Sequence, residues 1–184
     1  MASVVPAHLD RIRAAMDQYQ GRLIAFAARI TGDLESARDV VQDTFLRLCQ
    51  QDMDAIADHL PAWLFRVCRN RALDVRKKEG PLEPFDDAAD APTHGVSLDP
   101  HRLLEQSEAA RRVLAAVADL PPAQQEVLRL RFQEELSYKE ISAVTGHSVS
   151  SVGFLIHTGV HRVRRQMQAV SPAAAPLQGG RKGA

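Results

Sequence analysis

The stretch LSYKEISAVTGHSVSSVGFLIHTGVHRVRRQ, residues 136–166, carries the residue types and spacings best suited to act on nucleic acid. Ser137 and Glu140 form the S-x-x-E pattern of a capping box, which starts a short helix. Gly146 suits the left-handed position that ends such a helix, and Ser148 can cap a second, longer helix that ends in arginines. Two helices joined by a tight glycine turn are typical of a DNA-reading helix-turn-helix, although plain helical hairpins share the pattern.

The second helix of this stretch is predicted to have an apolar face and a polar face. The face predicted to pack inward consists of Val149, Val152, Ile156, Val160, Val163 and Met167. The face predicted to meet solvent or a ligand consists of Ser150, Ser151, Gly153, Phe154, His157, Thr158, His161 and Arg165. No third ligand lies suitably near the two histidines in sequence, so we interpret them as solvated or phosphate-facing, and we predict no metal and no cofactor.

Composition limits the classes of protein to consider. The 184 residues hold 23 Lys and Arg against 23 Asp and Glu, which argues against a protein that coats nucleic acid by net charge. Charges interrupt every apolar run, so we predict no membrane span, and the first residues lack the pattern of a secretory signal. A cytoplasmic protein is expected. Cys49 and Cys68 lie in apolar stripes and are predicted to be buried structural thiols.

Helical periodicity dominates the whole chain, and the fold class is predicted to be all-α. The first unit has predicted helices over residues 8–30, after Asp33, and over 60–78, with an acidic loop at 50–58. We expect these helices to form a bundle of three to four helices.

A change in composition separates this bundle from a second helical unit. Residues 80–100 hold prolines and carboxylates and neither Lys nor Arg, which predicts an extended, flexible tether. The expected division is a first domain at 8–79, an acidic linker at 80–100, a four-helix domain with the helix-turn-helix at 101–170 and a disordered tail at 171–184.

Two segments in this order resemble a known family. RITGDLESARDVVQDTFLRLCQ followed by AWLFRVCRNRALDVRKK resembles region 2 of the extracytoplasmic-function (ECF) sigma factors of the sigma-70 family, and LPPAQQEVLRLRFQEELSYKEISAVTGHSVSSVGFLIH resembles their region 4. The resemblance implies a non-enzymatic bacterial subunit that binds RNA polymerase core, recognises the −10 and −35 promoter elements and helps to melt DNA. It implies a monomer when free, and partners that include the β′ clamp coiled coil, the β flap, promoter DNA and, as an open alternative, an anti-sigma factor or another regulator.

The resemblance also assigns roles to residues. The set implied for core polymerase is Asp39, Gln42, Asp43, Phe45 and Leu46. The set implied for the −10 element is Trp63, Arg66, Arg69, Asn70, Asp74 and Arg76, and a core position is an equal alternative for Trp63. The set implied for the −35 element is Tyr138, Lys139, Ser148, Ser150, Ser151, Gly153, Phe154, His157, Thr158, His161, Arg162 and Arg165.

The chain departs from the family at several positions. Gly153 and Leu155 stand where members commonly carry Lys or Arg, with Phe154 between them. We expect either reading of DNA by shape, in which Phe154 meets thymine methyl groups, or binding of a protein such as an anti-sigma factor. Arg38 replaces an acidic residue that kin often carry, so core binding is expected to persist in weaker or regulated form. The segment 50–58, which corresponds to a base-capturing loop, lacks basic residues and Phe, so its base preference is not predictable.

Two other functions remain open at this point. A helix-turn-helix regulator that binds duplex DNA as a dimer explains residues 137–165, but not the segment DVVQDTFLRL. A polymerase adaptor that reads no promoter would explain the altered recognition helix. The acidic linker is expected either to enter the polymerase active-site cleft or to act as a simple spacer.

Overall fold

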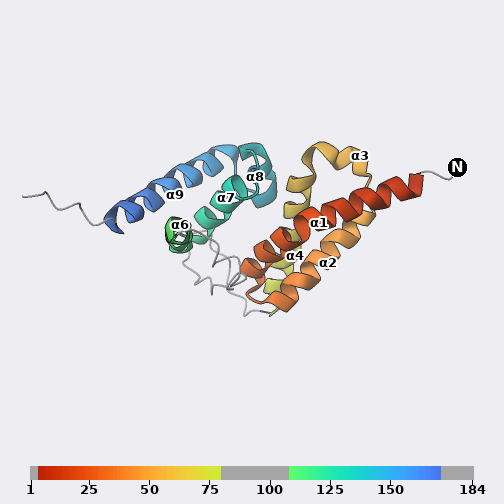
Figure 1. Cartoon of the computed structure of the whole chain (residues 1–184), viewed down its shortest axis with the longest axis horizontal. Helices are drawn as coiled ribbons and strands as arrows, with labels where there is room; N and C mark the ends of the chain where they lie inside the picture. Colours follow the sequence, from red (N-terminus) through yellow and green to blue (C-terminus); the bar gives the residue numbers. More distant parts are fainter. Residues whose placement is uncertain (1–3, 80–107, 171–184) are drawn as a thin grey trace, which may run out of the picture.

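Every element that the computed structural model describes, in residues 4–79 and 108–170, is a helix (Figure 1). The first range contains α1 (Val4–Thr31), α2 (Leu34–Cys49), α3 (Met53–Ile56), the 3-10 helix η1 (Ala57–His59) and α4 (Leu60–Glu79). The second contains α6 (Glu108–Ala118), α7 (Pro122–Phe132), α8 (Tyr138–Thr145) and α9 (Val149–Val170). The predicted all-α class with two helical domains is confirmed. The predicted linker at 80–100, the start of the second domain at 101–107 and the tail at 171–184 lie outside the described residues.

The first domain is a bundle of α1, α2 and α4, each packed on the other two. Gly32 adopts a φ of 88° and ends α1, and Asp33 accepts a hydrogen bond of 2.7 Å from the Ser36 N–H and caps α2. In the core, the rings of Phe26 and Phe65 meet edge to face with centroids 5.2 Å apart. The predicted breakpoint between the first two helices is therefore correct, and the aromatic pair joins α1 to α4.

The segment predicted as an acidic loop is largely helical. It forms α3 and η1, because Met53 and Ile56 are spaced by three residues and both turn into the core. Asp52 caps this turn by accepting from the Asp54 N–H at 2.9 Å. Arg11 of α1 then pairs with Asp54 at 2.6 Å and donates to the Met53 carbonyl at 2.9 Å. The acidic residues thus serve as a cap and as an anchor to α1.

The two cysteines differ in environment, which corrects one prediction. Cys68 is buried in the bundle, and burial raises the pKa of its thiol to about 12. Cys49 is exposed, so its prediction as a buried thiol was wrong. The reason is its place at the last position of α2, where the preceding residue, Leu48, takes the core position.

The second domain is built around α9, which packs against α6, α7 and α8. Its core includes Val127 and Leu130 from α7, Ile141 from α8 and Val152 from α9, all completely buried. Val149 was predicted to join this core but is 45% exposed. It is the first residue of α9, and the helix reaches the core only one turn later.

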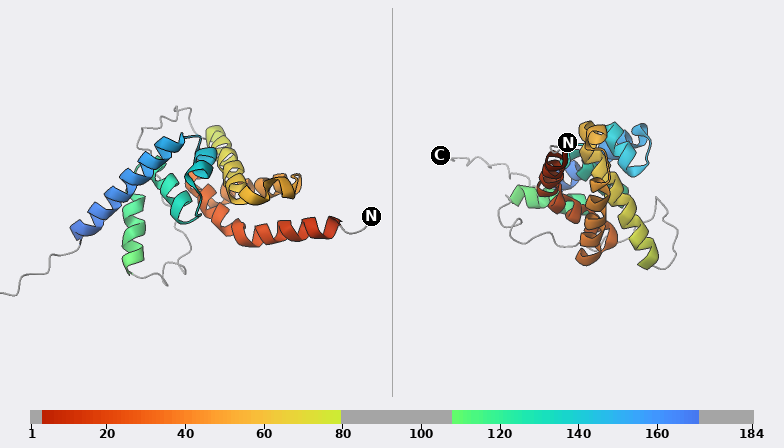
Figure 2. Two further views of the ribbon diagram at one scale, coloured as in Figure 1. Left: turned by 90° about the horizontal axis from the view of Figure 1, so that it is seen from above. Right: turned by 90° about the vertical axis from the view of Figure 1, so that its right-hand side faces the viewer.

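The two domains are in contact with each other. Helix α8 packs against α4 (Figure 2). Buried side chains from both domains form one continuous core cluster. Arg22 of α1 adds polar ties, since it donates to the Gln133 carbonyl at 3.1 Å and pairs with Glu134 at 2.7 Å. No helix within the described ranges is both long and apolar enough to cross a membrane.

Candidate nucleic-acid and polymerase interfaces

The outer face of α2 presents the residues predicted to bind polymerase core. Asp39, Gln42 and Leu46 are exposed and lie at i, i+3 and i+7, so they share one face of the helix. Leu46 is 55% exposed, which is unusual for an apolar side chain on an otherwise polar face. Arg38 is exposed beside this face. The arrangement is a polar surface with one apolar contact point, which suits a protein interface.

Two other residues of the predicted core-binding set are engaged within the bundle. Phe45 is only 5% exposed and packs in the core, which corrects its prediction as an interface residue. The physical reason is helix geometry, since Phe45 lies in the buried stripe with Val41 and Leu48. Asp43 accepts a hydrogen bond of 2.8 Å from Arg71 of α4, so its carboxylate also ties α2 to α4.

Helix α4 distributes the predicted −10 residues over two faces. Arg66, Asn70 and Asp74 are exposed at intervals of four residues and form one polar row. Arg69 and Arg76 lie on the side that lines a cavity between the two domains. Trp63 is 8% exposed and belongs to the core cluster, so its position fits the core alternative rather than a −10 contact.

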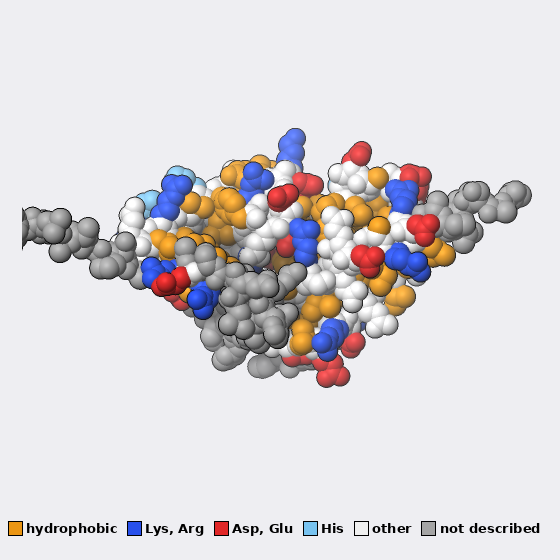
Figure 3. Space-filling view, in the orientation of Figure 1, with side chains coloured by type: hydrophobic (Ala, Val, Ile, Leu, Met, Phe, Trp, Pro, Cys, Tyr) orange, Lys and Arg blue, Asp and Glu red, His pale blue; other side chains and the backbone are white. Residues whose placement is uncertain are grey.

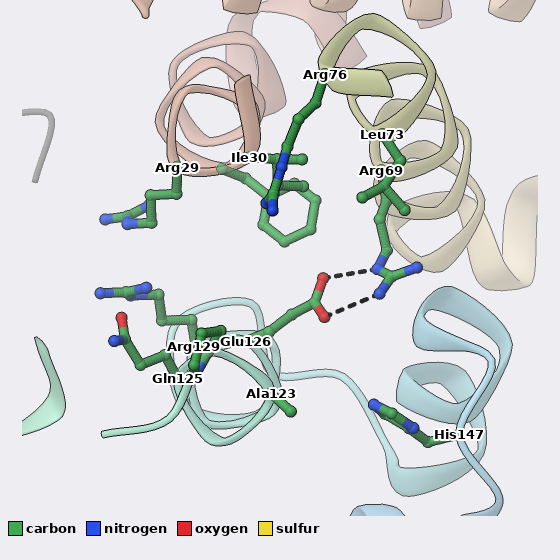
Figure 4. Close-up of a pocket in the computed structure, with 12 residues that line it drawn as sticks. Arg29, Ile30, Arg69, Leu73, Arg76, Ala123, Gln125, Glu126, Arg129 and His147 are labelled. Carbon is green, nitrogen blue, oxygen red and sulfur yellow. Dashed lines mark hydrogen bonds and ion pairs between the residues drawn. The ribbon is translucent and has the colours of Figure 1, made fainter. Parts of the chain in front are cut away.

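Arg69 is held by the second domain. Its Nε and Nη2 atoms donate to the two carboxylate oxygens of Glu126 on α7 at 2.7 and 3.2 Å (Figure 4). The side chains of Arg69 and Glu126 are 13% and 19% exposed, so this bidentate pair is shielded from solvent. The pair takes two of the five N–H donors of Arg69 and offsets its charge, so its attraction for a phosphate is reduced.

The helix-turn-helix has the local geometry that its sequence predicts. The Glu140 N–H donates to the Ser137 hydroxyl at 3.3 Å, and the Ser137 N–H donates back to the Glu140 carboxylate at 2.8 Å. Gly146 ends α8 at a φ of 82°. The Ser151 N–H donates to the Ser148 hydroxyl at 3.1 Å, which caps α9. These caps fix the angle between α8 and α9, and so the presentation of α9.

The two glycines of α9 accommodate neighbouring side chains. A Cβ at Gly153 would lie 3.6 Å from the ring of Tyr138, which is ordinary van der Waals contact. The guanidinium of Arg131 lies over the same Tyr138 ring, 5.7 Å from its centre. A Cβ at Gly159 would lie only 3.0 Å from Leu128 of α7, which is a tight contact. Gly159 therefore lets α9 approach α7 closely, whereas Gly153 is not required for packing.

The outer face of α9 is exposed around Phe154. This side chain is 67% exposed, and His157, His161 and Arg165 are exposed along the same helix. Among the remaining −35 residues, Ser148, Ser150, Ser151, Tyr138 and Lys139 are exposed, and Gly153 is half-buried under the tyrosine.

Two residues of the predicted −35 set are also tied to α7. The Gln124 amide donates to the Thr158 hydroxyl at 3.1 Å and accepts from Arg162 at 3.3 Å. This bridge orients the Arg162 side chain along the α7 side of α9.

An apolar groove between α6, α7 and α9 was not predicted from the sequence. It has a volume of about 240 Å³ and is lined mainly by apolar side chains, among them Val113, Val117, Phe132, Val160 and Val163. Phe132 is 64% exposed at its rim. On the face shown in Figure 3, hydrophobic side chains are visible over this domain. The signal in the sequence was Phe132, which lies at the C-terminal end of α7.

Comparisons with known proteins agree with this geometry. The family model for sigma-70 region 2 matches residues 15–81, and the model for sigma-70 region 4 matches residues 110–165. The ECF RNA polymerase sigma factor EcfG of Rhodopseudomonas palustris is 33% identical over 150 residues, which cover 80% of this chain and 78% of EcfG. The chain belongs to the ECF sigma factors of the sigma-70 family. Sigma factors of this family are non-catalytic subunits that direct RNA polymerase to promoters.

Other relatives of this sigma factor differ in length. SigW of Bacillus subtilis is 25% identical, and the match covers 86% of this chain and 90% of SigW. SigG of Mycobacterium tuberculosis is 29% identical over 88% of this chain, but the chain spans only 49% of SigG. A solved structure of CnrH in complex with the cytosolic domain of CnrY aligns with a TM-score of 0.53 and 25% identity, and covers 87% of this chain and 89% of CnrH.

The glycine contacts predict opposite tolerance to alanine. Gly153→Ala should raise the free energy of unfolding by about 1 kcal/mol, because alanine favours the helix and its Cβ fits beside Tyr138. Gly159→Ala should be less stable than Gly153→Ala, since its Cβ presses on Leu128. Urea unfolding of the two variants measures the difference. Equal or greater stability of Gly159→Ala would contradict the packing role of Gly159.

The Arg69–Glu126 pair predicts how firmly the sigma domains are held together. Glu126→Gln should weaken the closed arrangement by about 1–2 kcal/mol, because it removes one charge from a shielded bidentate pair. Energy transfer between dyes on α2 and α9 should then report a longer mean distance. Glu108→Gln, which removes an exposed carboxylate on α6, is the control and should leave the distance unchanged. An unchanged distance in Glu126→Gln would contradict this role.

Proposed function

We propose that this chain binds RNA polymerase core and directs it to promoters whose −10 element meets α4 and whose −35 element meets α9. The observation that carries the proposal is the presence of regions 2 and 4 in one chain, with the polar faces of α2, α4 and α9 largely exposed. The proposed division of the chain is a first domain at 8–79 and a second at 101–170, with a linker at 80–100. A dimeric regulator is not favoured, because region 2 would then have no role.

The proposed −10 contact uses the exposed row of α4. Arg66 is placed to bind a phosphate, and Asn70 can engage a base that melting has exposed. Asp74 continues the row and can accept hydrogen bonds from base amino groups. Arg69 joins this surface only when Glu126 releases it, so full −10 contact requires the two domains to separate.

The proposed −35 contact centres on Phe154. With Gly153 before it, the aromatic side chain stands clear of basic neighbours, and its 67% exposure leaves it available to the methyl groups of thymine in the major groove. Arg162 and Arg165 follow on the exposed side and supply phosphate contacts. In this proposal the helix selects sequence largely by apolar contact, and its arginines fix its position on the duplex.

Two surfaces are proposed for polymerase core. The face of Asp39, Gln42 and Leu46 on α2 fits the β′ clamp coiled coil, since it combines a carboxylate and an amide with one exposed leucine. The apolar groove rimmed by Phe132 fits the β flap, because its volume and lining suit the apolar face of a helix or hairpin. Arg38 adds a positive charge beside the first surface and is expected to reduce affinity there.

A protein regulator is a further proposed partner. The structural neighbour CnrH was solved in complex with the cytosolic domain of CnrY, and its fold covers most of this chain. A regulator that bound the same exposed faces of α2 and α9 would compete with core polymerase and DNA. We propose this as a second level of control, and we propose that the chain acts in the cytoplasm as a monomer until it joins core.

Substitution of Leu46 tests the proposed core surface. Leu46→Ala should weaken binding to purified core polymerase about tenfold, because a buried apolar anchor contributes about 1–2 kcal/mol at an interface. Leu34→Ala on the same helix is the matched control, since Leu34 is 42% exposed but lies on another face. Both affinities can be measured by fluorescence anisotropy. An equal loss in both variants, or none in Leu46→Ala, would exclude this face.

Substitution of Phe154 tests the proposed −35 contact. Phe154→Ala should weaken binding to a −35 duplex about fivefold, which corresponds to about 1 kcal/mol of apolar contact. Phe132→Ala removes a phenylalanine of similar exposure from the groove and should leave duplex binding unchanged while weakening core binding. Unchanged duplex affinity in Phe154→Ala, together with weaker binding of a protein regulator, would make this residue a protein contact.

A further inference from the structure

Positive charge is concentrated in a cavity between the two domains, apart from the exposed DNA-facing rows. The cavity has a volume of about 80 Å³, and Arg29 of α1, Arg69 and Arg76 of α4 and Arg129 of α7 line it. The one carboxylate among its lining residues is Glu126, which is already bound to Arg69. These four arginines and one glutamate give the lining a formal charge of +3.

Arg29 and Arg129 place like charges next to each other. In Figure 4 their guanidinium groups lie side by side, although they come from different domains, and Arg76 extends toward the same space from α4. Neither Arg29 nor Arg129 forms an ion pair with a carboxylate of the described residues. Glu134 acts on Arg29 electrostatically, but its ion pair is with Arg22.

The energetic effect of this arrangement is unfavourable without a counter-ion. The pKa of Arg129 is lowered to about 10, chiefly by burial and in part by the charge of Arg29. Burial also lowers the pKa of Arg29, and the charge of Glu134 offsets this only in part. Both shifts mean that the protonated guanidinium groups are less stable here than in water. An anion between them would remove that penalty.

The first turn of α7 adds hydrogen-bond donors to the same cavity. Pro121 precedes this helix and no side chain caps it, so the N–H groups of Ala123 and Gln124 have no acceptor within the helix. Pro122, Ala123 and Glu126 line the cavity. The positive end of the helix dipole therefore reinforces the arginines.

We propose that this interdomain cavity binds a small anion with two adjoining phosphoryl groups, of the kind carried by nucleoside di- and triphosphates. Guanidinium groups bind phosphate oxygens in pairs, and Arg29 and Arg129 supply two such groups from opposite sides of the cavity, neither of them ion-paired with a carboxylate of the described residues. Because the arginines come from both domains, the anion holds the domains together. By holding the domains closed it also keeps Arg69 paired with Glu126, so that it opposes −10 recognition, a consequence that rests on the proposed function.

Titration of the full chain with inorganic pyrophosphate tests the site, in buffer without divalent cations and at ionic strength held constant with NaCl. The midpoint of thermal unfolding should rise saturably with pyrophosphate. Arg29→Gln and Arg129→Gln should bind at least tenfold more weakly, and each should unfold at a higher midpoint than the unsubstituted chain when no anion is present, since a like charge is gone. Arg13→Gln, which removes an exposed arginine of α1, is the control and should bind as the unsubstituted chain does.

Several outcomes would overturn the proposal. One is a midpoint of thermal unfolding that does not rise saturably with pyrophosphate. Another is an equal rise of that midpoint with pyrophosphate in Arg29→Gln and Arg13→Gln. If Arg129→Gln does not fold, Arg129→Lys decides, because it keeps the charge but loses paired binding, and its affinity should still fall severalfold. If binding of a single-stranded oligonucleotide depends on Arg29 and binding of pyrophosphate does not, the cavity is a site for DNA phosphates and the small anion is excluded. Polymerase and promoter are absent from the titration, so its result does not depend on the proposed function.

Discussion

Helix α4 packs against helices of both domains, and much of the structure depends on these two contacts. One side of this helix completes the bundle with α1 and α2, and another side packs against α8 of the second domain. The bidentate bond between Arg69 and Glu126 lies at this second contact. While Glu126 offsets its charge and takes two of its five N–H donors, Arg69 attracts a phosphate less strongly. The contact therefore links the arrangement of the domains to access to the proposed −10 surface.

The second consequence of domain contact is the accumulation of positive charge. Arg29 and Arg129 would be solvated and far apart if the domains were separate, but contact brings them side by side in a partly buried cavity. The apolar contact of α4 with α8 favours closure, and the charge repulsion opposes it. A balance of this kind is sensitive to one charge or one bound anion. Opening for promoter recognition would relieve the repulsion and release Arg69 at the same time.

Local rules predicted the helix-turn-helix in detail. The capping box of Ser137 and Glu140, the left-handed Gly146 and the cap at Ser148 depend on neighbours a few residues away, and all are present. The same holds for the cap at Asp33. Where single positions at a helix end decide burial, the periodic pattern failed, as at Cys49 and Val149. The helical turn at Met53 and Ile56 was missed because two apolar residues are too few to give a periodic signal.

Contacts between segments far apart in the chain could not be predicted from the sequence. Phe45 fits both a core stripe and an interface motif, and only the packed bundle assigns it to the core. The pairing of Arg69 with Glu126 joins residues 57 positions apart on either side of the linker, so no local spacing predicts it. Gly159 could be explained only with Leu128 in place, since a glycine in a helix looks costly until its neighbour is known.

The most direct test of the account is in vitro transcription with purified core polymerase on fragmented genomic DNA, with start sites mapped in the presence and absence of this protein. The account predicts new start sites that share one −35 and one −10 sequence, and thymines in the −35 sequence where Phe154 would lie. Core polymerase that binds the protein yet starts nowhere new would contradict promoter recognition by α4 and α9. Failure to bind core at all would contradict the role assigned to the face of Asp39, Gln42 and Leu46.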